Sequence, residues 1–238
     1  MKKFWDFAKN AKTGERELRL EGIIGEDVWL DDETTPKQFC DELFSGNGDL
    51  TLWINSCGGD VFAASAIYTA LKEYRGKVTV KIDSLAASAA SVVAMARDTV
   101  LMSPTAMLML HNPATIAAGD CKELKLALRA LDEVKETIIN AYQLKTGLSR
   151  EYISRLMDAE TWLNAKKAVE MKFADGILYT DNGADKVQDA IIFSQSIITN
   201  SIVGKLKKSV GVSRQNLSST PSPVKVKKLR RRLEGYLH

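Results

Sequence analysis

Residues 50–61 read Leu-Thr-Leu-Trp-Ile-Asn-Ser-Cys-Gly-Gly-Asp-Val, and the fold can be worked out from this stretch. Its first part is mostly apolar, aromatic or β-branched, which predicts a strand over 50–55. The glycine pair marks a turn, and the pattern over 61–74 predicts a helix that Gly76 ends. Residues 78–82 predict a second strand. This strand–helix–strand alternation is typical of an α/β fold with a largely parallel sheet.

The same alternation continues outward in both directions. The other predicted elements are, in chain order, a strand within 18–31, a helix over 34–44, a helix in the small-residue segment 84–96, strands over 99–102 and 107–111, helices over 120–145, 149–157 and 165–171, and a strand over 174–179. The long helix has an apolar stripe at three- or four-residue spacing, formed by Leu124, Leu128, Leu131, Val134, Ile138 and Tyr142. We expect the body to end near residue 180, with one more helix over 187–206.

The net charge of +3 hides an asymmetry along the chain. Residues 201–238 hold ten Lys and Arg and one Glu and so carry +9, whereas residues 1–200 carry 23 − 29 = −6. Residues 212–223 are rich in Ser, Thr, Asn and Pro, as linkers are, and a basic cluster follows them. We therefore predict a folded domain over 1–180 and a basic, partly disordered extension over 181–238.

Composition excludes several classes of protein. Apolar residues make up 45% and charged residues 26% of the chain, which excludes disorder throughout. The three cysteines form no Cys-x-x-Cys pair, so we expect neither a metal site nor a disulfide framework. No apolar run approaches the roughly 18 residues of a membrane span, and charges interrupt the N-terminal stretch where a signal peptide would need apolar residues. We expect a cytoplasmic protein that does not bind membranes.

A few residues could carry chemistry. His111 is the only histidine besides the last residue, and it follows a predicted strand, where catalytic groups commonly lie. The backbone N–H groups of Gly58-Gly59 suit an oxyanion hole. The residues alone leave alternatives open, because a structural histidine, a plain turn and a small-residue helix explain the same features. They do not choose among the three hydroxyls of 84–91, which are Ser84, Ser88 and Ser91. They also do not choose among three acids that could orient a histidine: Asp158, Glu160 and Asp175.

Taken together, four segments resemble the proteolytic subunit of the Clp protease family (ClpP). They are, in order, a glycine segment over 54–61 followed by Ala66-Ile67-Tyr68, the nucleophile segment Ala86-Ala87-Ser88, the histidine segment over 109–113, and a closing segment over 160–170 followed by Phe173-Ala174-Asp175-Gly176. The resemblance covers most of residues 18–180. It implies an α/β fold of the ClpP/crotonase-like type, a superhelix of repeated β-β-α units with a long handle helix over 120–145.

The resemblance also assigns roles. It implies that Ser88 is the nucleophile of a serine endopeptidase, His111 its general base and Glu160 the third triad member, with Asp158 as a rival. It places the oxyanion hole at the N–H groups of Gly59 and Ala89. It requires no metal or cofactor, and it implies a homo-oligomeric ring, heptameric or, as two stacked rings, tetradecameric, joined through the handle helix.

Some positions depart from the housekeeping pattern. Cys57 stands where the family commonly has proline, and Ala89-Ala90 where it commonly has methionine and glycine. The stretch 25–39 is more similar to Clp-like proteases of phages and prophages, and the basic extension is absent from the housekeeping form. They imply a head maturation protease that cleaves capsid or scaffold proteins in the bacterial host cytoplasm. Three alternatives are a proteolytic subunit working with a Clp ATPase, a crotonase-like CoA enzyme, and an inactive capsid scaffold.

Overall fold

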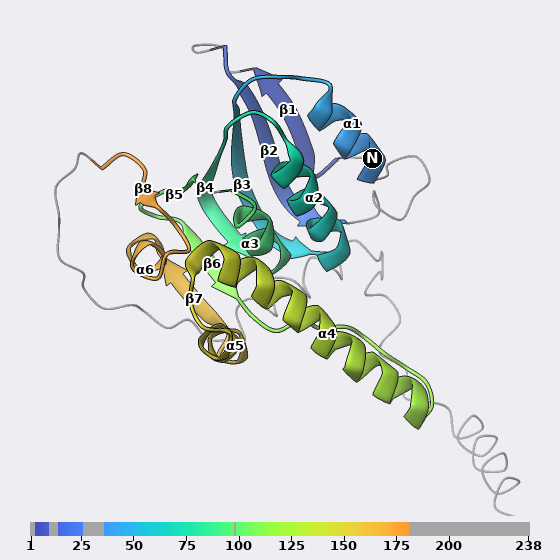
Figure 1. Ribbon diagram of the computed structural model, residues 1–238. Helices are drawn as coiled ribbons and strands as arrows, with labels where there is room; N and C mark the ends of the chain where they lie inside the picture. The colour runs from blue at the N-terminus through green and yellow to red at the C-terminus, as the bar shows by residue number, and fades with distance from the viewer. Residues whose placement is uncertain (1–2, 10–13, 26–35, 98, 181–238) are drawn as a thin grey trace, which may run out of the picture. The chain divides into compact units, whose positions relative to one another are not determined.

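The computed structural model describes residues 3–9, 14–25, 36–97 and 99–180 (Figure 1). The chain divides into two units, and all described residues belong to the first, residues 1–192. Three regions singled out in the sequence lie wholly or mostly outside the described residues: the stretch 25–39, the predicted helix over 187–206 and the extension 181–238. The predicted domain boundary at residue 180 therefore stays a prediction.

The described elements alternate between strands and helices. They are β1 (Trp5–Lys9), β2 (Arg16–Ile24), α1 (Pro36–Phe44), β3 (Leu50–Gly59), α2 (Val61–Glu73), β4 (Val78–Ala87), α3 (Ala89–Ala94), β5 (Thr99–Met102), β6 (Met107–Leu110), α4 (Cys121–Thr146), α5 (Arg150–Asp158), β7 (Thr161–Asn164), α6 (Ala165–Glu170) and β8 (Gly176–Ile177). The order confirms the α/β class, and α4 is the expected long helix.

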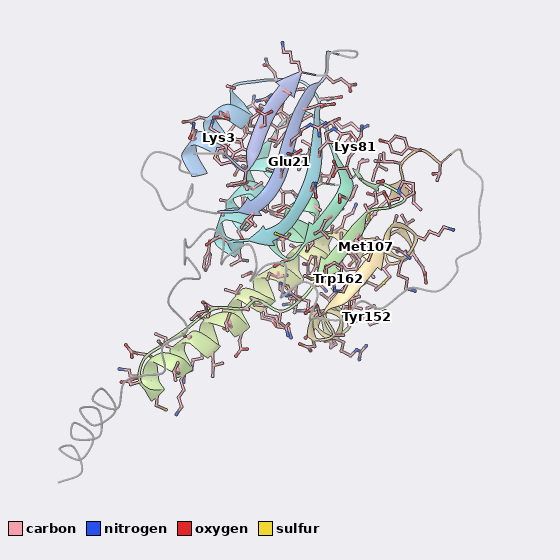
Figure 2. All side chains as sticks on the ribbon, turned by 180° about the vertical axis from the view of Figure 1, so that it is seen from behind. Lys3, Glu21, Lys81, Met107, Tyr152 and Trp162 are labelled. Atoms are coloured by element: carbon pink, nitrogen blue, oxygen red, sulfur yellow. The ribbon has the colours of Figure 1, made fainter. Side chains whose placement is uncertain are left out.

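One sheet organises the body. Its main path runs β1-β2-β3-β4-β5-β8, and β6 joins it by pairing with β4 and with β7. The pairing is parallel except at β1/β2 and β6/β7. Helices α1, α2 and α3 lie over one face of strands β1–β4, and the view from behind shows the other face of these strands, with Glu21 and Lys81 on it (Figures 1 and 2). Because parallel strands end at the same edge, the sheet gathers the loops after β3, β4 and β6.

Local chemistry explains where the helices begin and end. Asp60 caps α2, since its carboxylate accepts a hydrogen bond from the Ala63 amide at 2.8 Å. Asp120 and Glu123 form a capping box at the start of α4, and Gly147 ends that helix in the left-handed conformation. The sequence pattern therefore predicted both ends of α4 to within a residue.

Three sequence-based expectations were wrong or incomplete. Residues 84–87 were predicted to begin a helix, but they extend β4, because their backbone pairs with β3 and β6. The helix begins only at Ala89. The strands β1 and β7 were missed. Both are short, and the antiparallel partner that each finds in the sheet decides its conformation.

The apolar stripe of α4 also divides in two. Ile138 and Tyr142, toward its C-terminus, are buried in the core of the body. Toward its N-terminus, Leu124 and Leu128 are 42% and 62% exposed, and this part of the helix projects beyond the sheet (Figure 1). Helical periodicity therefore predicted the stripe, but it did not predict that one half of the stripe is buried and the other half is exposed. No helix of the described residues is long and apolar enough to span a membrane.

Candidate active site

Register in the sheet brings the nucleophile and histidine segments together. Strand β4 ends at Ala87, which pairs with Met109 of β6. One residue later, the Ser88 amide donates a hydrogen bond to the Met109 carbonyl at 3.0 Å. His111 follows the end of β6, so both side chains emerge from the same edge of the sheet. His111 Nε2 and Ser88 Oγ lie 2.7 Å apart.

The backbone of Ser88 is unusual. Its φ of 54° and ψ of −128° lie outside the regions that most residues adopt. Such conformations store energy, occur preferentially at functional sites and need support from their surroundings. Here the conformation turns the chain sharply from β4 into α3 and leaves the hydroxyl facing His111.

The glycine pair lies directly beside this turn. Gly58 has a φ of 91°, and a Cβ atom there would lie 2.6 Å from the Ala87 carbonyl oxygen and 2.9 Å from the Ala89 amide nitrogen. Gly59 has a φ of 147°, and a Cβ atom would lie 2.0 Å from the Ile24 carbonyl oxygen. No other residue type fits at either position without moving backbone, so the pair is more than a plain turn.

A cavity of about 520 Å³ opens next to the serine and histidine. Gly59, Ser88, Ala89 and His111 belong to its wall. The rest of the wall is mostly apolar and comes from the start of α2, the loop after β6 and one side of α4. Its apolar residues include Val61, Phe62, Pro113, Ala114, Ala127, Ala130, Leu131, Val134 and Ile138. Such a wall suits an apolar side chain better than a charged one.

The electrostatics favour a neutral imidazole. Burial lowers the pKa of His111, and the nearby Glu160 carboxylate opposes this by raising it. A neutral ring leaves Nε2 free to accept the Ser88 proton. The ring therefore has the protonation state that a general base needs at neutral pH.

Glu160 approaches His111 through the antiparallel pair β6/β7. Leu110 pairs with Thr161, so the residues flanking this pair, His111 and Glu160, lie next to each other. Glu160 has a φ of 47°, a second strained position in the site. Its carboxylate acts on His111 through charge, since the hydrogen bonds found among the described residues include none between these two side chains.

Asp158, the rival third member, has other partners. Its Oδ1 accepts hydrogen bonds from Asn112 Nδ2 at 2.8 Å and from Lys135 Nζ at 2.6 Å. The hydrogen bonds with Lys135 and Asn112 lower its pKa. Asp158 therefore connects the residue after His111 to α4, while Glu160 is the carboxylate whose charge acts on the ring.

The remaining candidates lie elsewhere or are engaged. Ser84 is exposed on β4. Asp175 accepts hydrogen bonds from the Val100 amide and from Lys145. Ser91 is fully buried, and its hydroxyl lies 2.5 Å from the Ser88 carbonyl oxygen and 2.7 Å from the Tyr142 hydroxyl. Only Ser88 of the three serines contacts His111 in the structure.

Sequence reasoning missed Asn112, Lys135 and Tyr142. The sequence pattern places Tyr142 only in an apolar stripe, and its hydroxyl is the one signal that a buried tyrosine there needs a polar partner. Lys135 and Asn112 carried no such signal, because their contact with Asp158 joins segments far apart in the chain. Within the described residues no group of three or more His, Cys, Asp or Glu side chains could hold a metal ion.

Comparison with known proteins gives a consistent result. A family model described as Clp protease matches residues 31–181. The ATP-dependent Clp protease proteolytic subunit 1 of Chlamydia muridarum is 34% identical over 145 residues, which cover 59% of this chain and 76% of that protein. The same subunit of Chlamydia abortus is 29% identical over 187 residues, 71% of this chain and 97% of that protein. A point mutant of ClpP1 from Listeria monocytogenes shares the fold, with a TM-score of 0.60 and 23% identity over 69% of this chain and 91% of that one.

Proposed function

Since this chain belongs to the Clp protease family, we propose that it is a serine endopeptidase in which Ser88 is the nucleophile, His111 the general base and Glu160 the third member of the triad. The observation that carries the proposal is the 2.7 Å contact between Ser88 Oγ and His111 Nε2 at the wall of the cavity. A nucleophile in hydrogen-bond contact with a base is the arrangement that acyl transfer requires.

The chemistry proceeds in two halves. His111 Nε2 takes the Ser88 proton while Oγ forms a bond to the peptide carbonyl carbon. The protonated ring then gives the proton to the departing amine as the peptide C–N bond breaks, which leaves an acyl-enzyme. In the second half His111 takes a proton from water and the resulting hydroxide attacks the ester carbon. The bond between that carbon and Ser88 Oγ then breaks, Ser88 recovers its proton from the ring, and the acyl group leaves as a carboxylic acid.

The N–H groups of Gly59 and Ala89 are the proposed oxyanion hole. Both residues line the cavity beside Ser88. Each donor of this kind stabilises the transition state by about 3–4 kcal/mol in other hydrolases. Glu160 stabilises the imidazolium that forms in each half, because its charge favours the protonated ring.

Two biological roles fit this chemistry. The relatives' names are those of ATP-dependent proteolytic subunits, which supports peptide hydrolysis coupled to a Clp ATPase. The stretch 25–39 and the basic extension, both seen only in the sequence, support a phage or prophage head maturation protease acting on capsid or scaffold proteins. Mixing the purified protein with neighbouring capsid proteins, with and without a Clp ATPase and ATP, and measuring intact masses separates the two roles.

Self-association through α4 is part of the proposal. Leu124 and Leu128, four residues apart on one face of α4, are 42% and 62% exposed on the half of the helix that projects from the body. Exposed apolar side chains grouped in this way are typical of a contact surface. The ring expected from the family resemblance would cover them.

The chemistry is tested at Ser88. We expect Ser88→Ala to lower hydrolysis of a small apolar peptide by 10⁴-fold or more, roughly the cost of removing a triad member elsewhere. A fluorophosphonate probe should label Ser88 in the wild type, which mass spectrometry of the labelled peptide would identify. Undiminished hydrolysis by Ser88→Ala, or labelling at Ser84 in its place, would contradict the proposal and leave the inactive-scaffold and CoA-enzyme alternatives.

A further inference from the structure

Tyr142 and Ser91 form a buried chain of hydroxyl groups that ends on the backbone of the nucleophile. Ser91 Oγ lies 2.5 Å from the Ser88 carbonyl oxygen, and the Tyr142 hydroxyl lies 2.7 Å from Ser91 Oγ. Both side chains are almost completely buried, Ser91 at 0% and Tyr142 at 1% exposed. The chain connects α4 to the first turn of α3.

The direction of these hydrogen bonds follows from the number of protons. A carbonyl oxygen only accepts, so Ser91 must donate its single hydroxyl proton to Ser88. Ser91 Oγ can then only accept from Tyr142, which makes the tyrosine the donor. Burial raises the pKa of Tyr142 above its ordinary value, so the hydroxyl keeps its proton at neutral pH.

The Ser88 carbonyl belongs to the same peptide group as the Ala89 N–H. In a trans peptide the C=O and the N–H point in opposite directions. Fixing the carbonyl toward Ser91 therefore fixes the amide of Ala89 toward the other side, where Ser88 and Ala89 line the cavity. The Ser91 amide also donates to the same carbonyl, at 2.9 Å, so this oxygen accepts two hydrogen bonds.

The strained backbone explains why such support is needed. The orientation of this peptide group depends on the ψ angle of Ser88, which is −128° alongside a φ of 54°. Unusual dihedral angles persist only where the surroundings hold them. Hydrogen bonds in series also polarise one another, which makes the amide at the far end a better donor.

We propose that Ser91 and Tyr142 are positioning residues for the oxyanion hole, holding and polarising the Ser88–Ala89 peptide so that the Ala89 N–H faces the developing oxyanion. This rests on the proposed function, since it assigns Ala89 to the oxyanion hole of a serine endopeptidase. It gives α4 a task at the active site besides lining the cavity.

The test uses substitutions that remove only a hydroxyl from the full-length protein. We expect Ser91→Ala to lower kcat for a small peptide about tenfold, less than the 10²–10³-fold cost of deleting an oxyanion donor. Tyr142→Phe should lower kcat about threefold, because Ser91 still donates to Ser88 but is no longer polarised. KM should stay within about twofold in both, since the effect is confined to the transition state. Affinity for a peptide aldehyde, which forms an oxyanion on Ser88, should fall in parallel with kcat/KM.

A matched control and a double variant separate positioning from stability. Tyr68→Phe removes a hydroxyl that has no hydrogen-bond partner among the described residues and should leave kcat unchanged. Ser91→Ala leaves the Tyr142 hydroxyl buried and unpaired, so the Tm of this variant should fall. The double variant Ser91→Ala with Tyr142→Phe removes both partners, so its Tm should return toward the wild-type value. The kcat of the double variant should stay at the Ser91→Ala level.

The results separate this inference from the proposed function. A kcat that follows Tm across the variants, or a wild-type kcat in Ser91→Ala while Ser88→Ala is inactive, overturns the positioning role alone. Full activity of Ser88→Ala overturns the proposed function and this inference together. Should Ser91→Ala fail to fold, a wild-type kcat and aldehyde affinity in Tyr142→Phe would overturn the inference by itself.

Discussion

Two corners of the site are built in different ways. The nucleophile corner, formed by Gly58, Ser88, Ala89 and His111, lies at the ends of adjacent parallel strands. In it Ser88 Oγ and His111 Nε2 are in hydrogen-bond contact at 2.7 Å. The acid corner holds Asp158, the last residue of α5, and Glu160, which lies in the turn between α5 and β7. There Glu160 acts on His111 through charge, and Asp158 is bonded to Asn112 and Lys135. Parallel register therefore places the proposed nucleophile and base, whereas the short antiparallel pair β6/β7 places the Glu160 carboxylate beside His111.

The largest effect is expected from breaking the nucleophile corner without touching its polar groups. In Gly58→Ala a Cβ atom would lie 2.6 Å from the Ala87 carbonyl oxygen and 2.7 Å from Ser88 Cβ. The turn must shift to accept it, which should misplace Ser88 and the Ala89 amide and lower kcat about 10³-fold. We also expect a loss of about 2 kcal/mol or more of unfolding free energy, measured by urea denaturation.

The matched control for this prediction is Gly14→Ala. Gly14 also has a positive φ, 72°, but a Cβ atom there would meet nothing within 4 Å. Gly14→Ala should lower the free energy of unfolding, because alanine is strained at a positive φ, and should leave kcat unchanged. Equal loss of kcat in the two variants would show that general destabilisation, and not the geometry of the nucleophile corner, is responsible.

A smaller effect is expected at the acid corner. Glu160→Gln removes the charge that stabilises the imidazolium, and kcat should fall about 10²-fold, less than the roughly 10⁴-fold cost where the carboxylate is hydrogen-bonded to the ring. Asp158→Asn, at the end of α5 two residues before Glu160, is the matched control and should lower kcat only a few-fold, by loosening Asn112 and Lys135. Steady-state hydrolysis of a small peptide measures both. A larger loss in Asp158→Asn than in Glu160→Gln would reverse the assignment of the third member.

Glu160→Gln should also shift the pH profile of kcat/KM, and the charges of Glu160 and His111 decide the direction of the shift. In the proposed mechanism hydrolysis requires neutral His111, so kcat/KM should fall as the pH drops through the pKa of the ring. Burial keeps this pKa below its ordinary value near 6.5, and the Glu160 carboxylate raises it. Without that carboxylate the pKa falls further, so the acid limb in Glu160→Gln should move to lower pH. A shift to higher pH would show that Glu160 does not act on His111.

The two corners also differ in how far sequence reasoning could reach. The glycine pair and the small-residue segment 84–96 indicated which residues lie at the nucleophile corner, although β3 and β4 both run further than the predicted strands over 50–55 and 78–82. Strand β7 has four residues, Thr161–Asn164, and it forms because β6 offers an antiparallel edge. The missed strand therefore hid why Glu160 lies beside His111. The choice between Glu160 and Asp158 depended on Lys135 and Asn112, which no pattern in the chain connects to either acid.

A smaller effect still is expected where α4 meets the acid corner. Lys135 of α4 donates a hydrogen bond to Asp158, so a displacement of α4 should move Asp158 in the acid corner. Leu128→Glu, on the exposed half of the helix, should disrupt self-association, measured by light scattering, and lower kcat per subunit a few-fold. Leu144→Glu is the control, since Leu144 is 77% exposed on the other half of the same helix. A monomeric wild type at micromolar concentration, or loss of assembly in both variants, would count against an interface at the projecting half.

The smallest effect should come from removing everything after residue 180. Both corners, the cavity and the Tyr142–Ser91 chain lie within residues 58–161. A protein ending at residue 180 should therefore hydrolyse a small peptide at the wild-type rate, within about twofold. The basic extension, with +9 between residues 201 and 238, should instead govern docking, because basic clusters bind acidic surfaces or nucleic acid in a salt-dependent way. Co-sedimentation with capsid precursors at low and high salt measures this. If truncation lowers kcat, the extension contributes to one of the corners, and repeating Glu160→Gln and Ser88→Ala in the truncated protein would show which.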